Sequence, residues 1–255
     1  MPLTSYPGFE TVPSFSPDGN QVAFSWNGEK GDNYDIYVKL IGSGRTLRLT
    51  TDPAADRTPA WSPDGRSIAF RRTEANEDVT IYLVPALGGP EREIARLGKT
   101  SFMFIGGWSP DGRRLLVSWK DRADEPSRLF WVSVDNGETH RLTSPPPTTQ
   151  GDWWGRISPD GRTIAFVRVR TTAGFTRQTG DLYTLPLSPE FLPKLESPNV
   201  SHSTTRPSGK WRLPATAGRS CFRPPAAARW LCGDYPSPAW KNQRVWKQLK
   251  TPFIP

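Results

Sequence analysis

The chain has 255 residues, enough for one large domain or two small ones, and it contains 22 glycines, 27 prolines and 35% hydrophobic residues. This composition is typical of an all-β protein with many turns, or of a folded part followed by a disordered part. No run of about 18 apolar residues occurs, which excludes a membrane-spanning helix, and the N-terminus shows no secretory signal. We expect a cytoplasmic protein if the chain is complete, and a periplasmic one if it is a piece of a secreted or membrane-anchored protein.

The formal net charge of +8 is concentrated in the last quarter of the chain. Residues 191–255 contain 11 Lys/Arg and 2 Asp/Glu, whereas residues 1–190 contain 22 and 23, a net charge of −1. A nucleic-acid-binding surface needs a basic folded face. The first 190 residues therefore show no sign of a nucleic-acid partner.

A four-residue motif, Ser-Pro-Asp-Gly, occurs four times in this neutral part, with its serines 46, 47 and 49 residues apart. The copies are Ser16, Pro17, Asp18, Gly19; Ser62, Pro63, Asp64, Gly65; Ser109, Pro110, Asp111, Gly112; and Ser158, Pro159, Asp160, Gly161. A period of this length indicates a repeat architecture.

Each repeat predicts four β-strands in the same order along the chain. Short runs rich in β-branched and aromatic residues precede the motif (12–15, 59–61, 105–108 and 155–157) and follow it (21–26, 67–70, 114–119 and 163–167). A third run follows a polar gap of variable length (35–38, 80–84, 129–132 and 181–185). A fourth closes three of the repeats (47–50, 94–97 and 141–143).

The motif itself predicts a tight hairpin between the first two strands. Proline presets φ for the second position of a turn, aspartate tolerates the third, and glycine takes a positive φ. The serine or aspartate side chain can bond a nearby backbone N–H. We interpret all sixteen motif residues as structural turn residues.

Four antiparallel strands in each repeat of about 40–50 residues predict an all-β fold, a β-propeller of about four blades. The repeats resemble the WD40-like PD40 repeat of the TolB-like six-bladed β-propeller family. The resemblance rests on an aromatic residue before the motif, Ile68-Ala69-Phe70 after it, Asp35-Ile36-Tyr37 in the third strand and Arg48-Leu49-Thr50 in the fourth. It covers residues 2–189 and implies a propeller with more blades than four.

The repeat stops before a fifth motif, which the period would place near residue 205. We predict two regions: PD40/TolB-like propeller repeats over 1–190, and over 191–255 a basic tail rich in Pro, Arg and Trp that is disordered or the product of a changed reading frame. The fourth repeat lacks a convincing last strand, and residues 192–195 are the only segment there that resembles one. We therefore expect an incomplete propeller and a purified chain that is marginally stable or oligomeric, because open sheet edges favour aggregation.

Residue types that could carry chemistry are present but scattered. No nucleophile, phosphate-loop or zinc-protease motif occurs. His140 is expected at the surface beside a strand end, and Asp32, Asn33 and Asp35 lack the spacing of a calcium loop. Trp61, Trp108, Trp153 and Trp154 could line a binding mouth but are expected to pack between blades. Cys221 and Cys232, and the basic residues of 241–250, lie in the tail, where we read them as incidental.

The sequence thus predicts a non-enzymatic chain with no cofactor and no metal. Our first hypothesis is a TolB-like propeller module that binds a protein or peptide of unknown identity through its loops and channel mouth. The alternative is a detached propeller of a larger protein. The resemblance extends to sensor domains C-terminal to bacterial Ser/Thr kinases or winged-helix regulators, and to gating propellers of prolyl-oligopeptidase-type peptidases.

Overall fold

The computed structural model describes residues 2–100, 103–122, 124–170, 179–188 and 199–203. All of these belong to one compact unit, Met1–Thr205. In this part of the chain no helix is long and apolar enough to cross a membrane. The tail residues singled out from the sequence, including both cysteines, lie outside the described residues.

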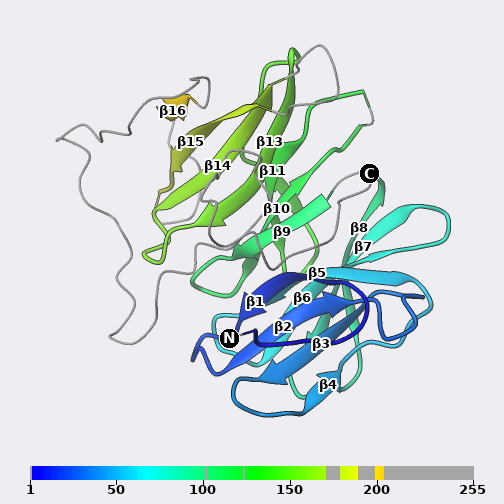
Figure 1. The fold of residues 1–255 in the computed structure, drawn as a ribbon. Coiled ribbons are helices and arrows are strands. Elements are labelled where there is room, and N and C mark those ends of the chain that lie inside the picture. The colour runs from blue at the N-terminus through cyan, green and yellow to red at the C-terminus, as the bar shows by residue number, and fades with distance from the viewer. Residues whose placement is uncertain (1, 101–102, 123, 171–178, 189–198, 204–255) are drawn as a thin grey trace, which may run out of the picture. The chain divides into compact units, whose positions relative to one another are not determined.

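Sixteen strands form four antiparallel sheets of four strands each, which we call blades 1 to 4 (Figure 1). Each sheet keeps its strands in chain order, so the first strand of each repeat is an edge strand. Blade 1 contains β1 (Glu10–Phe15), β2 (Gln21–Trp26), β3 (Asp35–Leu40) and β4 (Thr46–Arg48). Blade 2 contains β5 (Ala55–Trp61), β6 (Ser67–Thr73), β7 (Asp78–Pro85) and β8 (Arg92–Lys99). Blade 3 contains β9 (Met103–Trp108), β10 (Arg114–Trp119), β11 (Arg128–Ser133) and β12 (Thr139–Arg141). Blade 4 contains β13 (Thr149–Ile157), β14 (Thr163–Arg170), β15 (Gly180–Pro186) and β16 (Asn199–Ser203).

The last strand of blade 4 corrects the prediction that this repeat lacks one. β16 pairs antiparallel with β15, with Tyr183 opposite Val200 and Thr184 opposite Asn199. Its sequence, Asn-Val-Ser-His-Ser, has little intrinsic strand signal, so its assignment depends on pairing with β15. Residues 192–195, the segment that weakly resembles a last strand in the sequence, lie outside the described residues.

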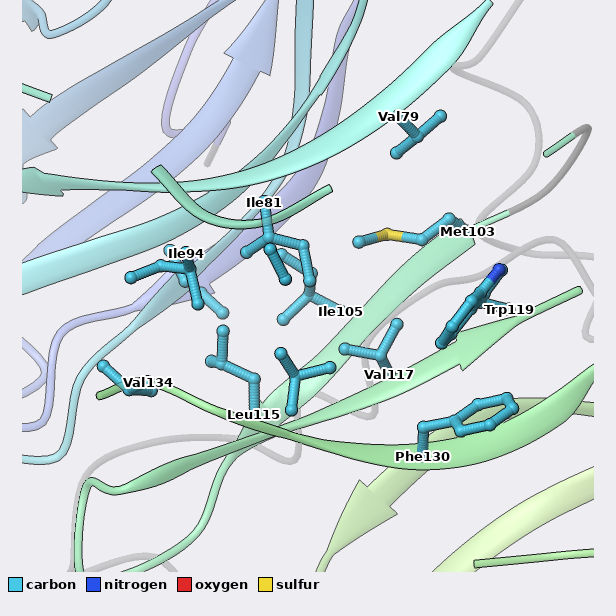
Figure 2. Packing of buried hydrophobic residues seen from close by; sticks show 14 of the residues in the cluster. Val79, Ile81, Ile94, Met103, Ile105, Leu115, Val117, Trp119, Phe130 and Val134 are labelled. Atoms are coloured by element: carbon cyan, nitrogen blue, oxygen red, sulfur yellow. The ribbon is translucent and has the colours of Figure 1, made fainter. Parts of the chain in front are cut away.

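Both faces of the inner blades are buried, because alternate side chains of each strand point to opposite neighbours. In blade 2, Ile68 and Phe70 pack in one apolar cluster with Ile36 of blade 1. Ala69 and Ile81 pack on the other side against Leu115 of blade 3. Figure 2 shows this second cluster, with Val79, Ile81 and Ile94 facing Met103, Ile105 and Val117. The apolar core therefore lies between the blades.

The outer side of blade 1 shows that the propeller is incomplete. In blade 2 the residue before the motif is Trp61. It is 7% exposed and packs in the apolar cluster shared with the preceding blade, blade 1. Phe15 holds the same place in blade 1 and is 50% exposed. On this side Tyr6 of the N-terminal segment packs against Phe24 and Trp26. The described residues thus form four blades of an all-β propeller without closure.

Candidate functional site

The four Ser-Pro-Asp-Gly motifs fold into the same turn, which joins the first two strands of each blade. The serine Oγ donates to the aspartate Oδ1 at 2.5–2.6 Å. That Oδ1 accepts the backbone N–H two residues later, and the serine Oγ accepts the N–H five residues later. The glycines have φ between 69 and 72°, a region that disfavours other residues. The serine and aspartate side chains of each motif are therefore hydrogen-bonded to partners inside their own turn.

The turn chemistry keeps the four aspartates ionised. The serine hydroxyl and the backbone N–H hold the pKa of Asp18, Asp64 and Asp160 below the usual 3.8. At Asp111 burial acts in the raising direction, yet the hydrogen bonds from Ser109 and the Arg113 N–H leave its pKa lowered as well. A carboxylate with a lowered pKa is poorly suited to act as a general base.

A second recurring arrangement ties blade 2 to blade 1 and blade 4 to blade 3. Asp56 of β5 is fully buried and binds Arg72 of β6 through two hydrogen bonds of 2.8 Å. It also interacts with the Thr50 hydroxyl, and its backbone N–H donates to the Tyr34 carbonyl of blade 1. Burial raises the pKa of Asp56 to about 6, while Arg72 and Thr50 act in the opposite direction. The carboxylate thus anchors one blade to the next.

Blade 4 repeats the anchor at the same positions, six residues before and ten residues after the motif serine. Asp152 binds Arg168 at 2.6 and 2.9 Å and interacts with the Thr143 hydroxyl of blade 3. The Arg168 guanidinium lies 4.6 Å from the centre of the Tyr183 ring. In blades 1 and 3 tryptophan replaces the arginine, and the Trp119 ring lies tilted, 4.4 Å from the Phe130 ring centre. The aspartate–arginine anchor thus occurs in blades 2 and 4 and is replaced in blades 1 and 3.

The edge strands that begin each blade are irregular near their middle. Their pairing with the next strand shifts between Thr11 and Ser14, between Arg57 and Ala60, and between Trp153 and Arg156. At these shifts Val12, Thr58 and Trp154 have φ of 52, 55 and 53°, each four residues before the motif serine. A non-glycine residue in this region is strained, and such strain is often retained at functional positions.

Beside the irregularity of β5 lies a pair of arginines, Arg57 and Arg71, which are opposite each other in the β5–β6 register. The Arg57 guanidinium stacks 3.5 Å from the centre of the Tyr34 ring. The Nε of Arg71 is buried without a hydrogen-bond partner. Burial first, and the charge of Arg57 second, lower the pKa of Arg71 to about 10. Arg71 therefore carries a positive charge with no carboxylate partner among the described residues. The anchor arginines differ, because each is paired with an aspartate.

The other residues considered from the sequence do not converge on a site. His140 is exposed on β12, opposite Trp131. The Asp32 carboxylate accepts the Asn33 N–H, and Asp35 pairs with Arg48. No group of three or more metal-ligating side chains occurs among the described residues.

The tryptophans have separate surroundings. Trp61 is buried between blades 1 and 2. The Trp108 indole N–H donates to the Ala60 carbonyl of blade 2 at 3.0 Å. Trp153 and Trp154 lie next to each other on β13, with ring centres 5.5 Å apart.

Comparison with known proteins agrees with this geometry. The family model described as the TolB beta propeller domain, PD40, matches residues 2–103. This match spans blades 1 and 2. A comparison with curated proteins gives no match.

Solved structures with the same fold include TolB propellers. TolB from Acinetobacter baumannii matches with 20% identity and a TM-score of 0.56, over 69% of this chain and 41% of that one. A protein from Agrobacterium tumefaciens described as TolB matches with 24% identity and a TM-score of 0.58, over 71% and 64%. A prolyl endopeptidase structure matches with 15% identity and a TM-score of 0.51, over 70% and 28%. The chain thus spans less than two thirds of each of these structures, and the likeness concerns the fold.

Sequence reasoning missed both the anchor and the arginine pair. The anchor had a signal, since Asp56 and Asp152 stand at equal distances before their motif serines, as Arg72 and Arg168 stand after them. The pair of Arg57 and Arg71 had none, because their meeting depends on the register shift in β5.

Proposed function

We propose that the PD40 blades form a non-catalytic module that binds a protein or peptide. The single observation that carries this proposal is the position of the first strand of every blade at the edge of its sheet. Each lies at the edge of its sheet, and three contain a strained non-glycine residue at the same position. The outer side of β5 bonds the Tyr34 carbonyl through the Asp56 N–H, and that of β13 bonds Ser127 through Gln150 and Asp152. An edge strand offers backbone N–H and C=O groups that an extended peptide can pair with.

The side chains support binding rather than catalysis in this proposal. Each turn aspartate has its Oδ1 engaged by hydroxyl and backbone donors, and each anchor aspartate has both oxygens engaged by guanidinium donors. A general acid or base needs a side chain that can reach a substrate proton. In the described blades the turn aspartates stabilise their own turns, and the anchor aspartates join neighbouring blades.

A second candidate is a detached propeller of a larger protein, either the C-terminal sensor domain of a bacterial Ser/Thr kinase or winged-helix regulator, or the gating propeller of a prolyl-oligopeptidase-type peptidase. The structural likeness to a prolyl endopeptidase, of which the chain covers 28%, favours the last of these. Any catalysis would then belong to another domain.

A peptide library displayed on phage and selected against the full chain tests the proposal. Affinities of the selected peptides are then compared between the wild type and two variants at exposed strand positions, Pro13→Arg on the edge strand β1 and Thr139→Arg on the outer strand β12. We expect Pro13→Arg to weaken binding by about tenfold or more, or about 1.4 kcal/mol, and Thr139→Arg to leave it unchanged. Failure to select any peptide, equal losses in both variants, or hydrolysis of the bound peptides would contradict the proposal.

A further inference from the structure

Arg57 and Arg71 lie on the face of blade 2 that is turned toward blade 3. Arg57 is opposite Arg71 in the β5–β6 register, and Arg71 is opposite Ile81 in the β6–β7 register, so the three side chains share one face. Ile81 packs in the cluster that contains Met103 and Trp119 of blade 3. Arg71 therefore lies beside the apolar contact between blades 2 and 3, while the Arg57 guanidinium extends over the Tyr34 ring of blade 1.

No carboxylate neutralises this pair within the described residues. The buried ion pairs of the blade involve Arg72, whose guanidinium faces the other side and lies within 3.2 Å of oxygens of Asp52, Asp56 and Glu91. Among the described residues, the charge that acts on Arg71 is that of Arg57. Like charges directly opposite each other in a sheet are destabilising, and a buried charge is normally paired.

The fold does not require two arginines at these positions. In blade 1 the equivalent residues, five before and nine after the motif serine, are Thr11 and Ser25. In blade 3 they are Phe104 and Ser118. Blades with uncharged residues there have the same four-stranded order. The charge pair in blade 2 is thus an addition to the common blade.

The pair is placed where a ligand can reach it. Arg57 and Arg71 are both only partly buried, at the end of blade 2 opposite its Ser-Pro-Asp-Gly turn. Tyr34 holds the plane of the Arg57 guanidinium by stacking. A stacked guanidinium keeps its N–H edge available for two parallel hydrogen bonds to a carboxylate.

We propose that Arg57 and Arg71 receive a carboxylate of the peptide partner, from an acidic side chain or from a C-terminus. This inference rests on the proposed function and specifies the chemistry of the partner. The carboxylate supplies the counter-charge that the described residues lack, and it accepts from guanidinium N–H groups of the pair. A peptide rather than a nucleic acid is favoured because residues 1–190 carry a net charge of −1.

Fluorescence anisotropy with three labelled peptides of equal length tests this on the full chain. The first alternates glycine with glutamate and ends in an amide, the second alternates glycine with glutamine and ends in a free carboxylate, and the third is the glutamine peptide with an amide end. A poly-dT oligonucleotide of similar charge to the first peptide is the fourth probe. The variants are Arg57→Gln and Arg71→Gln, and the matched control is Arg66→Gln, an exposed arginine beside the turn at the other end of the blade.

We expect at least one carboxylate peptide to bind about tenfold more tightly than the neutral peptide, and which of the two does so distinguishes a side chain from a C-terminus. Arg57→Gln and Arg71→Gln should each remove this preference, whereas Arg66→Gln should keep it. The Arg57→Gln variant serves on its own if Arg71→Gln fails to fold.

The inference is overturned if no carboxylate peptide is preferred, if Arg66→Gln loses as much as the other variants, or if the oligonucleotide binds most tightly through the same arginines. Peptides selected from the library that bind the wild type and Arg57→Gln equally would overturn the carboxylate site and leave the proposed function standing. The absence of any peptide binding would overturn both.

Discussion

Replacing Arg71 by methionine should stabilise the fold, which is unusual for a partly buried residue. The side chain has no carboxylate partner among the described residues, and its Nε is buried without a hydrogen bond. Burial and the charge of Arg57 lower its pKa to about 10. Since one pKa unit equals about 1.4 kcal/mol, the charged form is disfavoured by about 3 kcal/mol relative to water. Methionine removes the charge and keeps most of the apolar stem in place.

We expect Arg71→Met to raise the free energy of unfolding by about 1–2 kcal/mol, because part of the gain is offset by the lost contacts of the guanidinium. The neighbouring residue provides the contrast. Arg72→Met leaves Asp56 buried without its bidentate partner, and breaking such a pair by removing one member lowers stability by about 3–5 kcal/mol. Two adjacent arginines of one strand should therefore change stability in opposite directions.

Urea denaturation of the full chain at neutral pH, followed by tryptophan fluorescence, measures both variants against the wild type. The midpoint should move to higher urea for Arg71→Met and to lower urea for Arg72→Met. A loss of stability in Arg71→Met comparable to that in Arg72→Met would refute the reasoning, because it would mean that Arg71 is neutralised in the native protein.

Three further predictions concern the turns and the anchor. Gly65→Ala should lower the unfolding free energy by about 1–2 kcal/mol because φ at Gly65 is 72°, whereas Gly44→Ala, in open space, should change it little in the same denaturation assay. Because the pKa of Asp64 is lowered in the fold, its charge stabilises the protein above pH 3.8 and this contribution is lost as the pH falls further. The stability difference between the wild type and Asp64→Asn should therefore shrink below about pH 4 in a pH series, and a constant difference would contradict the assignment. Thr143→Val should lower the melting temperature, with an unfolding penalty of about 1–3 kcal/mol, because it removes a hydroxyl that interacts with Asp152 and accepts the Leu129 N–H; an unchanged melting temperature would count against the anchor.

The elements that could be predicted from the sequence are those whose cause is local. The turn at Ser62 is set by its own four residues, and the strands beside it by runs such as Ile68-Ala69-Phe70, so four-stranded blades follow from the repeat. β16 could not be predicted in this way, since Asn199–Ser203 lacks an apolar alternation and its strand assignment follows from the pairing with β15.

Features that depend on two distant segments were beyond local reasoning. Asp56 and Arg72 are polar residues in a buried strand pair, and only their contact with Thr50 of the preceding blade explains why both are there. Arg57 and Arg71 meet because β5 shifts register two residues later. The spacing of equivalent residues across repeats indicates the first pair, and no sequence pattern indicates the second.

A structure of the full chain bound to a selected acidic peptide tests the central claim most directly. Our account predicts that the peptide lies along the first strands of the blades, with one of its carboxylates within hydrogen-bond distance of Arg57 and Arg71. A peptide bound on the outer strands, or one whose carboxylates point away from these two arginines, would contradict it.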